Sequence, residues 1–203
     1  MMKIYDIIEE FISGDWGNEE FSEEIPNEIF CIRGADIVPI TKHEFINVPK
    51  RYVSDKALSN KLLRVGDIVI EKSGGSPTQS TGRVVYVTED LIKEKGNVVC
   101  SNFCTAFRVR NGWNPYFIYQ YWQYIYNANV FFNFEGKTSG IKNLQLDAAI
   151  TSIQIKEWQL SDQNKIADIL MNIEKKMHLN SEINKNLPSP DRSLRAVEVR
   201  LAA

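Results

Sequence analysis

Residues 66–87 read GDIVIEKSGGSPTQSTGRVVYV, and this stretch contains the pattern that decides the fold. Gly66-Asp67 precedes a β-rich run from Ile68 to Glu71, in which the apolar side chains alternate between the two faces. Nine uncharged residues follow, from Ser73 to Thr81, and a second β-rich run extends from Arg83 to Val87. The stretch therefore predicts two strands joined by a long polar loop.

Two further β-rich segments indicate a sheet-containing core. They are residues 28–40, interrupted at Arg33-Gly34, and residues 97–110, in which β-branched and aromatic residues nearly alternate. Asn114-Pro115 predicts a helix start, because asparagine is a favoured N-cap and proline is tolerated at the first helical position. Aromatic residues then recur at helical spacing. They could form a base-stacking platform, but we interpret them as a face that packs on the sheet, the usual role of such a stripe.

A long helix is predicted from Ser161 to Leu187, with Ser161 as its N-cap. A helix of this length spans roughly 40 Å, more than the preceding domain needs. Its apolar side chains follow a heptad-like spacing, and an asparagine within such a seam can fix the register of two helices. We expect a partner helix to cover the seam, and a helix folded back on its own domain is the open alternative. The expected dimerisation residues are Ile166, Ile169, Ile173, Met177, Asn180, Ile183 and Leu187.

These patterns predict an α+β protein with three parts. A mixed, sheet-containing domain is expected over residues 1–157, and a long C-terminal dimerisation helix within residues 158–187. From Pro188 onward the sequence PSPDRSLRAVEVRLAA has no matching periodicity. We therefore expect residues 188–203 to be a tail outside the fold, either vector-derived or disordered.

The composition excludes several classes of protein. Three cysteines and two histidines do not suit a disulfide framework or a familiar zinc site, so we expect reduced thiols, a cytoplasmic location and no metal or cofactor. No charged and apolar leader opens the sequence. Residues 111–134 carry no charge, but their five asparagines and two glutamines would be costly in hydrocarbon. We therefore expect no membrane span.

Charge is distributed unevenly along the chain, whose net charge is −2. Residues 61–145 hold ten basic and six acidic residues, a local +4, whereas residues 1–60 hold six basic and twelve acidic ones. Attraction to phosphate follows the local field and not the total charge. The middle segment is therefore compatible with nucleic-acid binding.

No catalytic motif fits the polar loop. A P-loop needs a lysine and a hydroxyl residue directly after its glycines and a helix behind them, whereas here no lysine follows and the next element is a strand. A nuclease site could use Asp67, Glu71 and Lys72, but neighbouring strand residues point to opposite faces and cannot share one metal. The sequence has no dinucleotide fingerprint and no nucleophile–histidine pair. We expect no catalytic residues.

Recognition of DNA is the interpretation that remains. The loop offers short hydroxyl and amide groups for base edges, and cations beside it, Lys72 and Arg83, for phosphates. Residues 135–144, EGKTSGIKNL, have a similar composition, and Arg33-Gly34 is a third candidate. On composition alone, ordinary surface loops are the open alternative.

Six segments, in this order, resemble the specificity (S) subunits of type I restriction–modification systems. They are SGDWG (13–17), IRGADI (32–37), GDIVIEKSGGSPTQSTGRVVYV (66–87), SNF (101–103), TSGIKNL (138–144) and LSDQNKIADILMNIEKKMHLN (160–180). The last is similar to the family's Glu-Gln-x-x-Ile-Ala-x-Ile-Leu helix, with Asp162-Gln163 in place of Glu-Gln. Glu157-Trp158-Gln159 stands where a proline-rich lead-in is usual. The resemblance covers residues 5–187, which correspond to one target recognition domain and one spacer helix.

The resemblance implies a non-catalytic reader of double-stranded DNA. In such systems separate modification subunits carry the methyltransferase and its S-adenosylmethionine, and restriction subunits translocate and cleave. A full S subunit has two recognition domains and two spacer helices, so this chain is either a natural half-subunit or a fragment of a longer one. We expect a homodimer through an antiparallel pair of helices, which would place two domains on a bipartite DNA target.

The expected DNA-binding residues form two groups. Cations expected to contact mainly phosphate are Arg33, Lys72, Arg83, Lys137 and Lys142. Expected base readers are Ser76, Thr78, Gln79, Ser80, Thr138 and Asn143, and Ser73, Thr81 and Ser139 complete the set. Two alternatives stay open: an assembly or inhibitor module that binds modification subunits without reading DNA, and a self-contained DNA nuclease.

Overall fold

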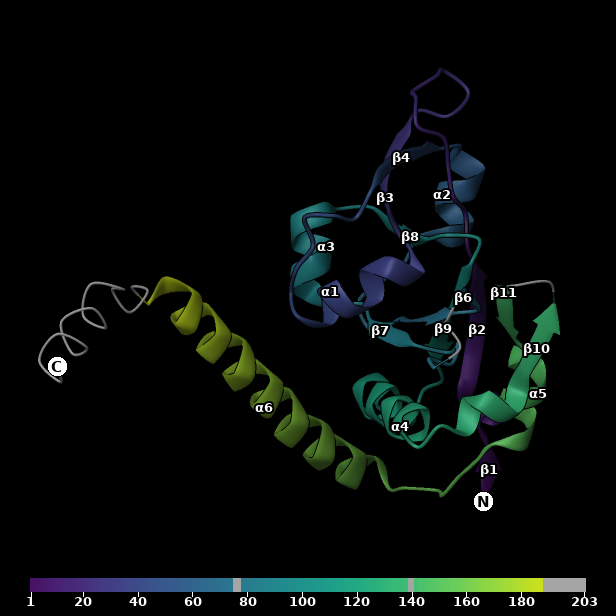
Figure 1. Ribbon diagram of the computed structural model, residues 1–203, viewed down its shortest axis with the longest axis vertical. Coiled ribbons are helices and arrows are strands. Elements are labelled where there is room, and N and C mark those ends of the chain that lie inside the picture. Colours follow the sequence, from purple (N-terminus) through teal and green to yellow (C-terminus); the bar gives the residue numbers. More distant parts are fainter. Residues whose placement is uncertain (75–77, 139–140, 188–203) are drawn as a thin grey trace, which may run out of the picture. The chain divides into compact units, whose positions relative to one another are not determined.

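The computed structural model describes residues 1–74, 78–138 and 141–187, with all their side chains except those of Lys137, Thr138 and Ile141 (Figure 1). The chain divides into two compact units, Met1–Ala167 and a second that begins at Asp168. The structure combines helices with mixed sheets and has one long C-terminal helix, so the predicted α+β class is confirmed. The predicted tail, residues 188–203, lies outside the described residues.

A four-stranded antiparallel sheet forms the centre of the first unit. Its order is β2 (Ile8–Ser13), β9 (Cys104–Val109), β5 (Ile68–Glu71) and β7 (Val84–Tyr86). The two strands predicted on either side of the polar loop are thus β5 and β7, which pair directly with each other. All four residues of β5 are buried, because both faces of this sheet are covered.

Different elements cover the two faces of the central sheet. On one face, Val69 and Val85 belong to a large apolar cluster with side chains of α1 (Ile37–Thr41) and α3 (Glu89–Lys95). Successive residues of a strand point to opposite faces. On the second face, Phe107 of β9 therefore meets the fully buried Trp122 of α4 (Pro115–Asn127), with ring centroids 5.7 Å apart.

The helix predicted at Asn114-Pro115 is α4, and its start has the expected cap. Asn114 Oδ1 accepts a hydrogen bond from the Phe117 N–H at 3.0 Å, and Pro115 occupies the first helical position. Phe117 and Ile125 of the aromatic stripe are buried, and α4 contacts β7 and β9. The helix packs on the sheet as interpreted, but the predicted stripe is only part of the packing face: Tyr124 is 69% exposed, and the buried face also includes Ile118 and Trp122.

A second sheet has the order β4 (Lys50–Val53), β3 (Asn27–Ile32) and β8 (Val98–Cys100). β3 pairs antiparallel with β4 and parallel with β8. Ala57 and Leu58 of α2 (Asp55–Lys61) pack on the buried cluster of this sheet, which contains Ile29 and Val99.

Residues 97–110, predicted as one strand, form two strands in different sheets. β8 pairs with β3, the chain turns, and β9 then joins the central sheet. The Cys104 N–H donates to the Ser101 carbonyl at 2.9 Å and closes the turn. The prediction of one continuous strand was wrong, because partners distant in the sequence decide where a β-rich run changes sheet.

Residues 28–40, predicted as β-rich with an interruption at Arg33-Gly34, are a strand only as far as Ile32, and no strand resumes after the interruption. The Asp36 carboxylate accepts hydrogen bonds from the Arg33 N–H at 2.9 Å and from the Arg33 guanidinium at 2.8 Å. This local cap begins η2 (Gly34–Asp36), and α1 follows at once. The capping contact overrides the β propensity of the apolar residues that follow.

Short elements complete the first unit. β1 (Met2–Lys3) pairs antiparallel with β12 (Gln154–Ile155). A third sheet has the order β10 (Glu135–Thr138), β11 (Ile141–Leu144) and β6 (Ser73–Gly74). The remaining elements are η1 (Ile4–Ile7), η3 (Val130–Phe134) and α5 (Leu146–Ser152).

The long helix α6 (Leu160–Asn186) agrees with the predicted helix to within one residue at each end, but Ser161, predicted as the N-cap, is its second helical residue. Gln163, which is fully buried, accepts a hydrogen bond from the Asn114 N–H at 2.8 Å and donates one to the Trp158 carbonyl at 3.0 Å. The glutamine of the helix motif therefore ties the first turn of α6 to the start of α4. Across the described parts of the chain, no helix has both the length and the apolar character that crossing a membrane requires.

The three cysteines are buried free thiols. Burial raises the pKa of Cys31 to about 12 and that of Cys104 to about 11, and it also raises the pKa of Cys100. Raised values keep the thiols protonated at pH 8, and the thiolate is the reactive form. We expect a thiol reagent at pH 8 to label the native chain about a hundredfold or more slowly than the denatured chain, as followed by absorbance. Fast native labelling of any of the three would contradict this burial.

Candidate nucleic-acid interface

The two loops predicted to bind DNA meet in the third sheet. β11 pairs antiparallel with β6, which places Asn143 opposite Ser73 and Lys142 opposite Gly74. The Ser73 hydroxyl donates to Asn143 Oδ1, although the two residues are 70 positions apart in the sequence. The Leu144 N–H also donates to the Lys72 carbonyl at 2.7 Å. The two segments therefore form one continuous polar edge.

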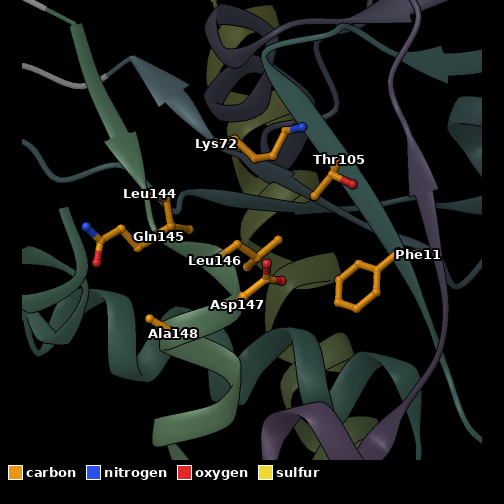
Figure 2. A pocket seen from close by; sticks show the side chains of 8 residues that line it. All are labelled: Phe11, Lys72, Thr105, Leu144, Gln145, Leu146, Asp147 and Ala148. Carbon is orange, nitrogen blue, oxygen red and sulfur yellow. The ribbon is translucent and has the colours of Figure 1, made fainter. Parts of the chain in front are cut away.

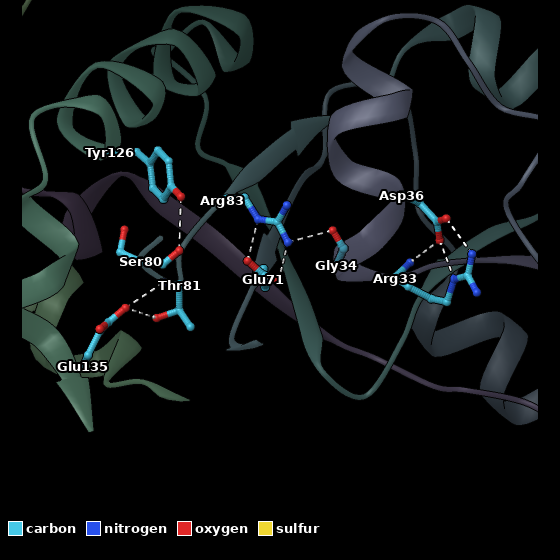
Figure 3. A network of polar contacts seen from close by, with 9 residues as sticks. All are labelled: Arg33, Gly34, Asp36, Glu71, Ser80, Thr81, Arg83, Tyr126 and Glu135. Atoms are coloured by element: carbon cyan, nitrogen blue, oxygen red, sulfur yellow. Dashed lines mark hydrogen bonds and ion pairs between the residues drawn. The ribbon is translucent and has the colours of Figure 1, made fainter. Parts of the chain in front are cut away.

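The end of the first loop is held by side chains of α4 and β10 (Figure 3). Trp122 Nε1 donates to the Gly82 carbonyl at 2.8 Å, and the Tyr126 hydroxyl donates to the Ser80 carbonyl at 3.1 Å. Glu135 accepts a hydrogen bond from the Thr81 N–H at 2.8 Å. Ser80 and Thr81 are only 3% and 0% exposed. Their side chains do not reach solvent, so we leave both out of the proposed DNA-contacting set.

Arg83, expected to contact phosphate, is bound inside the protein (Figure 3). Its Nε and Nη2 donate to the two oxygens of Glu71 at 2.8 and 2.6 Å, and Nη2 also donates to the Gly34 carbonyl at 3.0 Å. Glu71 is 2% exposed. Its hydrogen bonds raise the pKa of Arg83 above the ordinary arginine value. These contacts assign Arg83 to the support of the loop, and we leave it out of the phosphate-contacting set.

Two other expected phosphate contacts have internal partners. Arg33 forms an ion pair of 2.8 Å with the buried Asp36. Lys142 forms an ion pair of 3.0 Å with Glu135, and its ammonium lies 4.9 Å from the centroid of the Phe132 ring. A phosphate bound by Arg33 or Lys142 would therefore share the cation with a carboxylate of the protein.

An open pocket of about 700 Å³ lies beside the third sheet (Figure 2). Lys72 lines it, and Figure 2 shows its ammonium directed toward Thr105 of the central sheet. The remaining lining residues are Phe11, Leu144, Gln145, Leu146, Asp147 and Ala148. The charge of Lys72 therefore lies in the wall of this pocket, beside the paired strands β6 and β11.

Four of the expected DNA-contacting polar residues with described side chains are at least partly exposed. Thr78 and Asn143 are exposed, and Ser73 and Gln79 are half-buried. Ser76 and Ser139 lie outside the described residues, as do the side chains of Lys137 and Thr138. The described candidates for base contacts are therefore Ser73, Thr78, Gln79 and Asn143.

Sequence reasoning missed two residues that shape this interface. The Phe103 carbonyl accepts hydrogen bonds from the Lys72 and Ser73 N–H groups, at 2.8 and 3.2 Å, and its ring is 58% exposed. Glu135 binds both Thr81 and Lys142 and so connects the two loops. It is the single carboxylate in residues 95–146, a signal that the sequence contained.

The polar groups of the candidate interface are of the kinds that bind nucleic acids. It offers hydroxyl and amide groups beside lysines, the combination used for base edges and phosphates. No group of three or more His, Cys, Asp or Glu side chains that could hold a metal ion occurs within residues 1–74, 78–138 and 141–187, for the side chains described there.

Comparison with known families decides what kind of domain this is. The model of the type I restriction modification DNA specificity domain matches residues 36–189. The chain belongs to this family. The matched range includes β5 and β7, the whole third sheet and α6, so both candidate loops and the long helix lie within it. The suspected resemblance to S subunits is confirmed.

A chain of a solved type I R-M system, from work on its complex assembly and conformational transition, is similar in fold. The TM-score is 0.54 at 15% sequence identity, and the match covers 90% of this chain and 41% of that chain. This chain therefore spans less than half the length of that relative. Among curated protein sequences, none matches.

Proposed function

We propose that this chain recognises a specific double-stranded DNA sequence as the specificity subunit of a type I restriction–modification complex. In this proposal it is non-catalytic and cytoplasmic, and it positions separate methyltransferase and restriction subunits on a bipartite target. The observation that carries the proposal is the pairing of β11 with β6, which joins the two candidate loops into one polar edge. Membership of the specificity-domain family supports it.

The joined loops are suited to the major groove. B-DNA accepts a two-stranded β-ribbon in this groove, where asparagine and glutamine can form paired hydrogen bonds to adenine. We therefore assign base contacts to Gln79 and Asn143, with Thr78 and Ser73 beside them. Lys72 and Lys137 are the proposed phosphate contacts, and Arg33 and Lys142, whose charges are balanced by carboxylates, are left out of that set.

Selection from a randomised pool of duplexes with the full chain tests this function. We expect the bound fraction to converge on one sequence motif. A chain that enriches no motif but captures modification subunits in a pull-down would instead support the assembly-module alternative. Cleavage of the pool that depends on added divalent metal would contradict a non-catalytic role.

Gln79→Ala should relax the preference at one base position of the selected motif. Loss of a bidentate base contact costs about 1–3 kcal/mol of discrimination, and it leaves the salt dependence unchanged because no phosphate contact is lost. Affinities for the selected duplex and its single-base variants, measured by fluorescence anisotropy at several salt concentrations, check this prediction.

Two control variants separate the roles in that measurement. Gln159→Ala removes an exposed glutamine outside the loops and should change nothing. Lys72→Ala should weaken binding to all duplexes alike and reduce the salt slope by about 1. If Gln79→Ala weakened the binding of all duplexes equally, the assignment of Gln79 as a base reader would be wrong.

We also propose that two copies associate through α6. Ile169, Ile173 and Ile183 are 60%, 48% and 57% exposed, and Met177 and Leu187 are exposed as well. Large apolar side chains that recur on one face of a helix favour a partner helix. An antiparallel pair related by a twofold axis would give each complex two recognition domains, as a bipartite target requires.

A further inference from the structure

We propose that the ion pair between the buried Glu71 and the partly buried Arg83 is a positioning device for DNA recognition, which sets the discrimination between sequences without touching DNA. This inference rests on the proposed function. Its basis is the position of the pair, which lies at the base of the first loop and connects that loop to the turn after β3 (Figure 3).

The Glu71 carboxylate occupies a space that two glycines leave open. A Cβ placed on Gly34 would lie 2.5 Å from Glu71 Oε1, and one placed on Gly74 would lie 2.6 Å from the same oxygen. Gly74 also has a φ of +144°, which L-residues rarely adopt. Two backbone segments therefore close around the carboxylate, and Arg83 binds both of its oxygens.

The same pair connects the two ends of the first loop. Glu71 lies just before the loop, and its backbone N–H donates to the Arg83 carbonyl at 2.9 Å. The Gly82 N–H donates to the Glu71 carbonyl at 3.0 Å. Because β6 follows directly and pairs with β11, a shift at Glu71 would also move Asn143 of the second loop.

Burial of a charged pair is a poor way to gain stability. The loss of hydration offsets much of the attraction, and apolar replacements of similar volume are often equally stable. A buried pair does fix geometry, because each bidentate contact permits one arrangement. Base recognition requires that geometry, since displaced donors and acceptors no longer match the edge of one base.

The experiment compares three versions of the full chain: unaltered, Glu71→Gln, and Glu71→Gln with Arg83→Met. The single variant leaves the partly buried Arg83 guanidinium without its counter-charge, so its melting temperature should fall. The double variant removes that charge and should recover most of the loss. In both variants, we expect the preference for the selected duplex over the random pool to fall about tenfold or more, with an unchanged salt slope.

An ion pair between the buried Asp67 and the partly buried Arg108, next to the opposite end of β5, provides the control. Asp67 is 1% exposed and accepts hydrogen bonds from Arg108 at 2.8 and 3.0 Å. Asp67→Asn with Arg108→Met should change stability in the same way and leave the discrimination intact. A double variant of Glu71 and Arg83 that keeps full discrimination would overturn the inference and leave the pair a purely structural role.

Hydrogen exchange tests the pair independently of DNA. In the double variant, amide protection at Gly82 and Leu144 should fall about tenfold, while that of Val69 in the central sheet is retained. Unchanged protection at Gly82 and Leu144 overturns the inference, even if the unaltered chain selects no DNA. A lack of selection by the unaltered chain counts against the proposed function alone.

Discussion

Gly14→Ala should destabilise the fold by about 3 kcal/mol or more, the largest stability effect that we expect for a single substitution. A Cβ at this position would lie 1.9 Å from the Ser101 carbonyl oxygen and 2.9 Å from that of Cys100. Both obstructing atoms belong to the backbone. A shift of the backbone here would break hydrogen bonds. The Asp15 N–H donates to the Cys100 carbonyl at 2.7 Å, and the Ser101 N–H donates to the Ile32 carbonyl at 2.8 Å.

Urea denaturation followed by circular dichroism measures this effect. Gly136→Ala is the control, because a Cβ there would have its nearest neighbour at 3.5 Å, an ordinary contact, and its backbone needs no left-handed φ. The control should unfold at nearly the same urea concentration as the unaltered chain. If the free energy of unfolding of Gly14→Ala lay within about 0.5 kcal/mol of that of the unaltered chain, the segments at Gly14 and Ser101 would not approach each other as described.

Ile169→Asp combined with Ile173→Asp should convert the proposed dimer into a monomer, the largest effect expected on association. Both side chains lie on the exposed apolar face of α6. Each copy would bring two carboxylates into the contact, and burial of an unpaired charge is strongly unfavourable. We expect the dissociation constant to rise by about a thousandfold or more.

Sedimentation velocity over a range of micromolar concentrations checks the association. Met171→Asp is the matched control, since Met171 is also an exposed apolar residue, at 40%, but lies on the opposite side of the helix from Ile173. It should leave the dimer intact. An unaltered chain that stays monomeric at high micromolar concentration would refute the association through α6, while leaving the DNA-binding proposal to its own test.

Features that depend on neighbouring residues could be predicted from the sequence. The two strands around the polar loop, the Asn114 cap and the extent of α6 each follow from side chains within a few positions of one another. The order of six short segments was also sufficient to indicate the family, which the matched domain model confirmed. In these segments the local propensity and the capping signals agree with the tertiary structure, so the sequence pattern was sufficient to predict them.

Features that depend on distant partners could not be predicted in this way. Arg83 and Ser80 belong to a loop whose polar composition indicated an exposed binding surface, yet Glu71 binds the first and the second is buried. The break between β8 and β9 likewise depends on which sheet each strand joins. In each case the outcome depends on which groups are removed from water by residues many positions away, and composition does not contain that information.

The sequence by itself therefore determined that this protein is an α+β specificity domain with a long apolar-faced helix and two polar loops. Tertiary structure alone decided that the loops form one edge, through the pairing of Asn143 with Ser73, and which of their residues stay outside. The physical reason is that hydrogen bonds between strands and buried ion pairs join groups far apart in the chain. Among the described loop residues, these contacts bury Ser80 and Thr81 and bind Arg83 to Glu71.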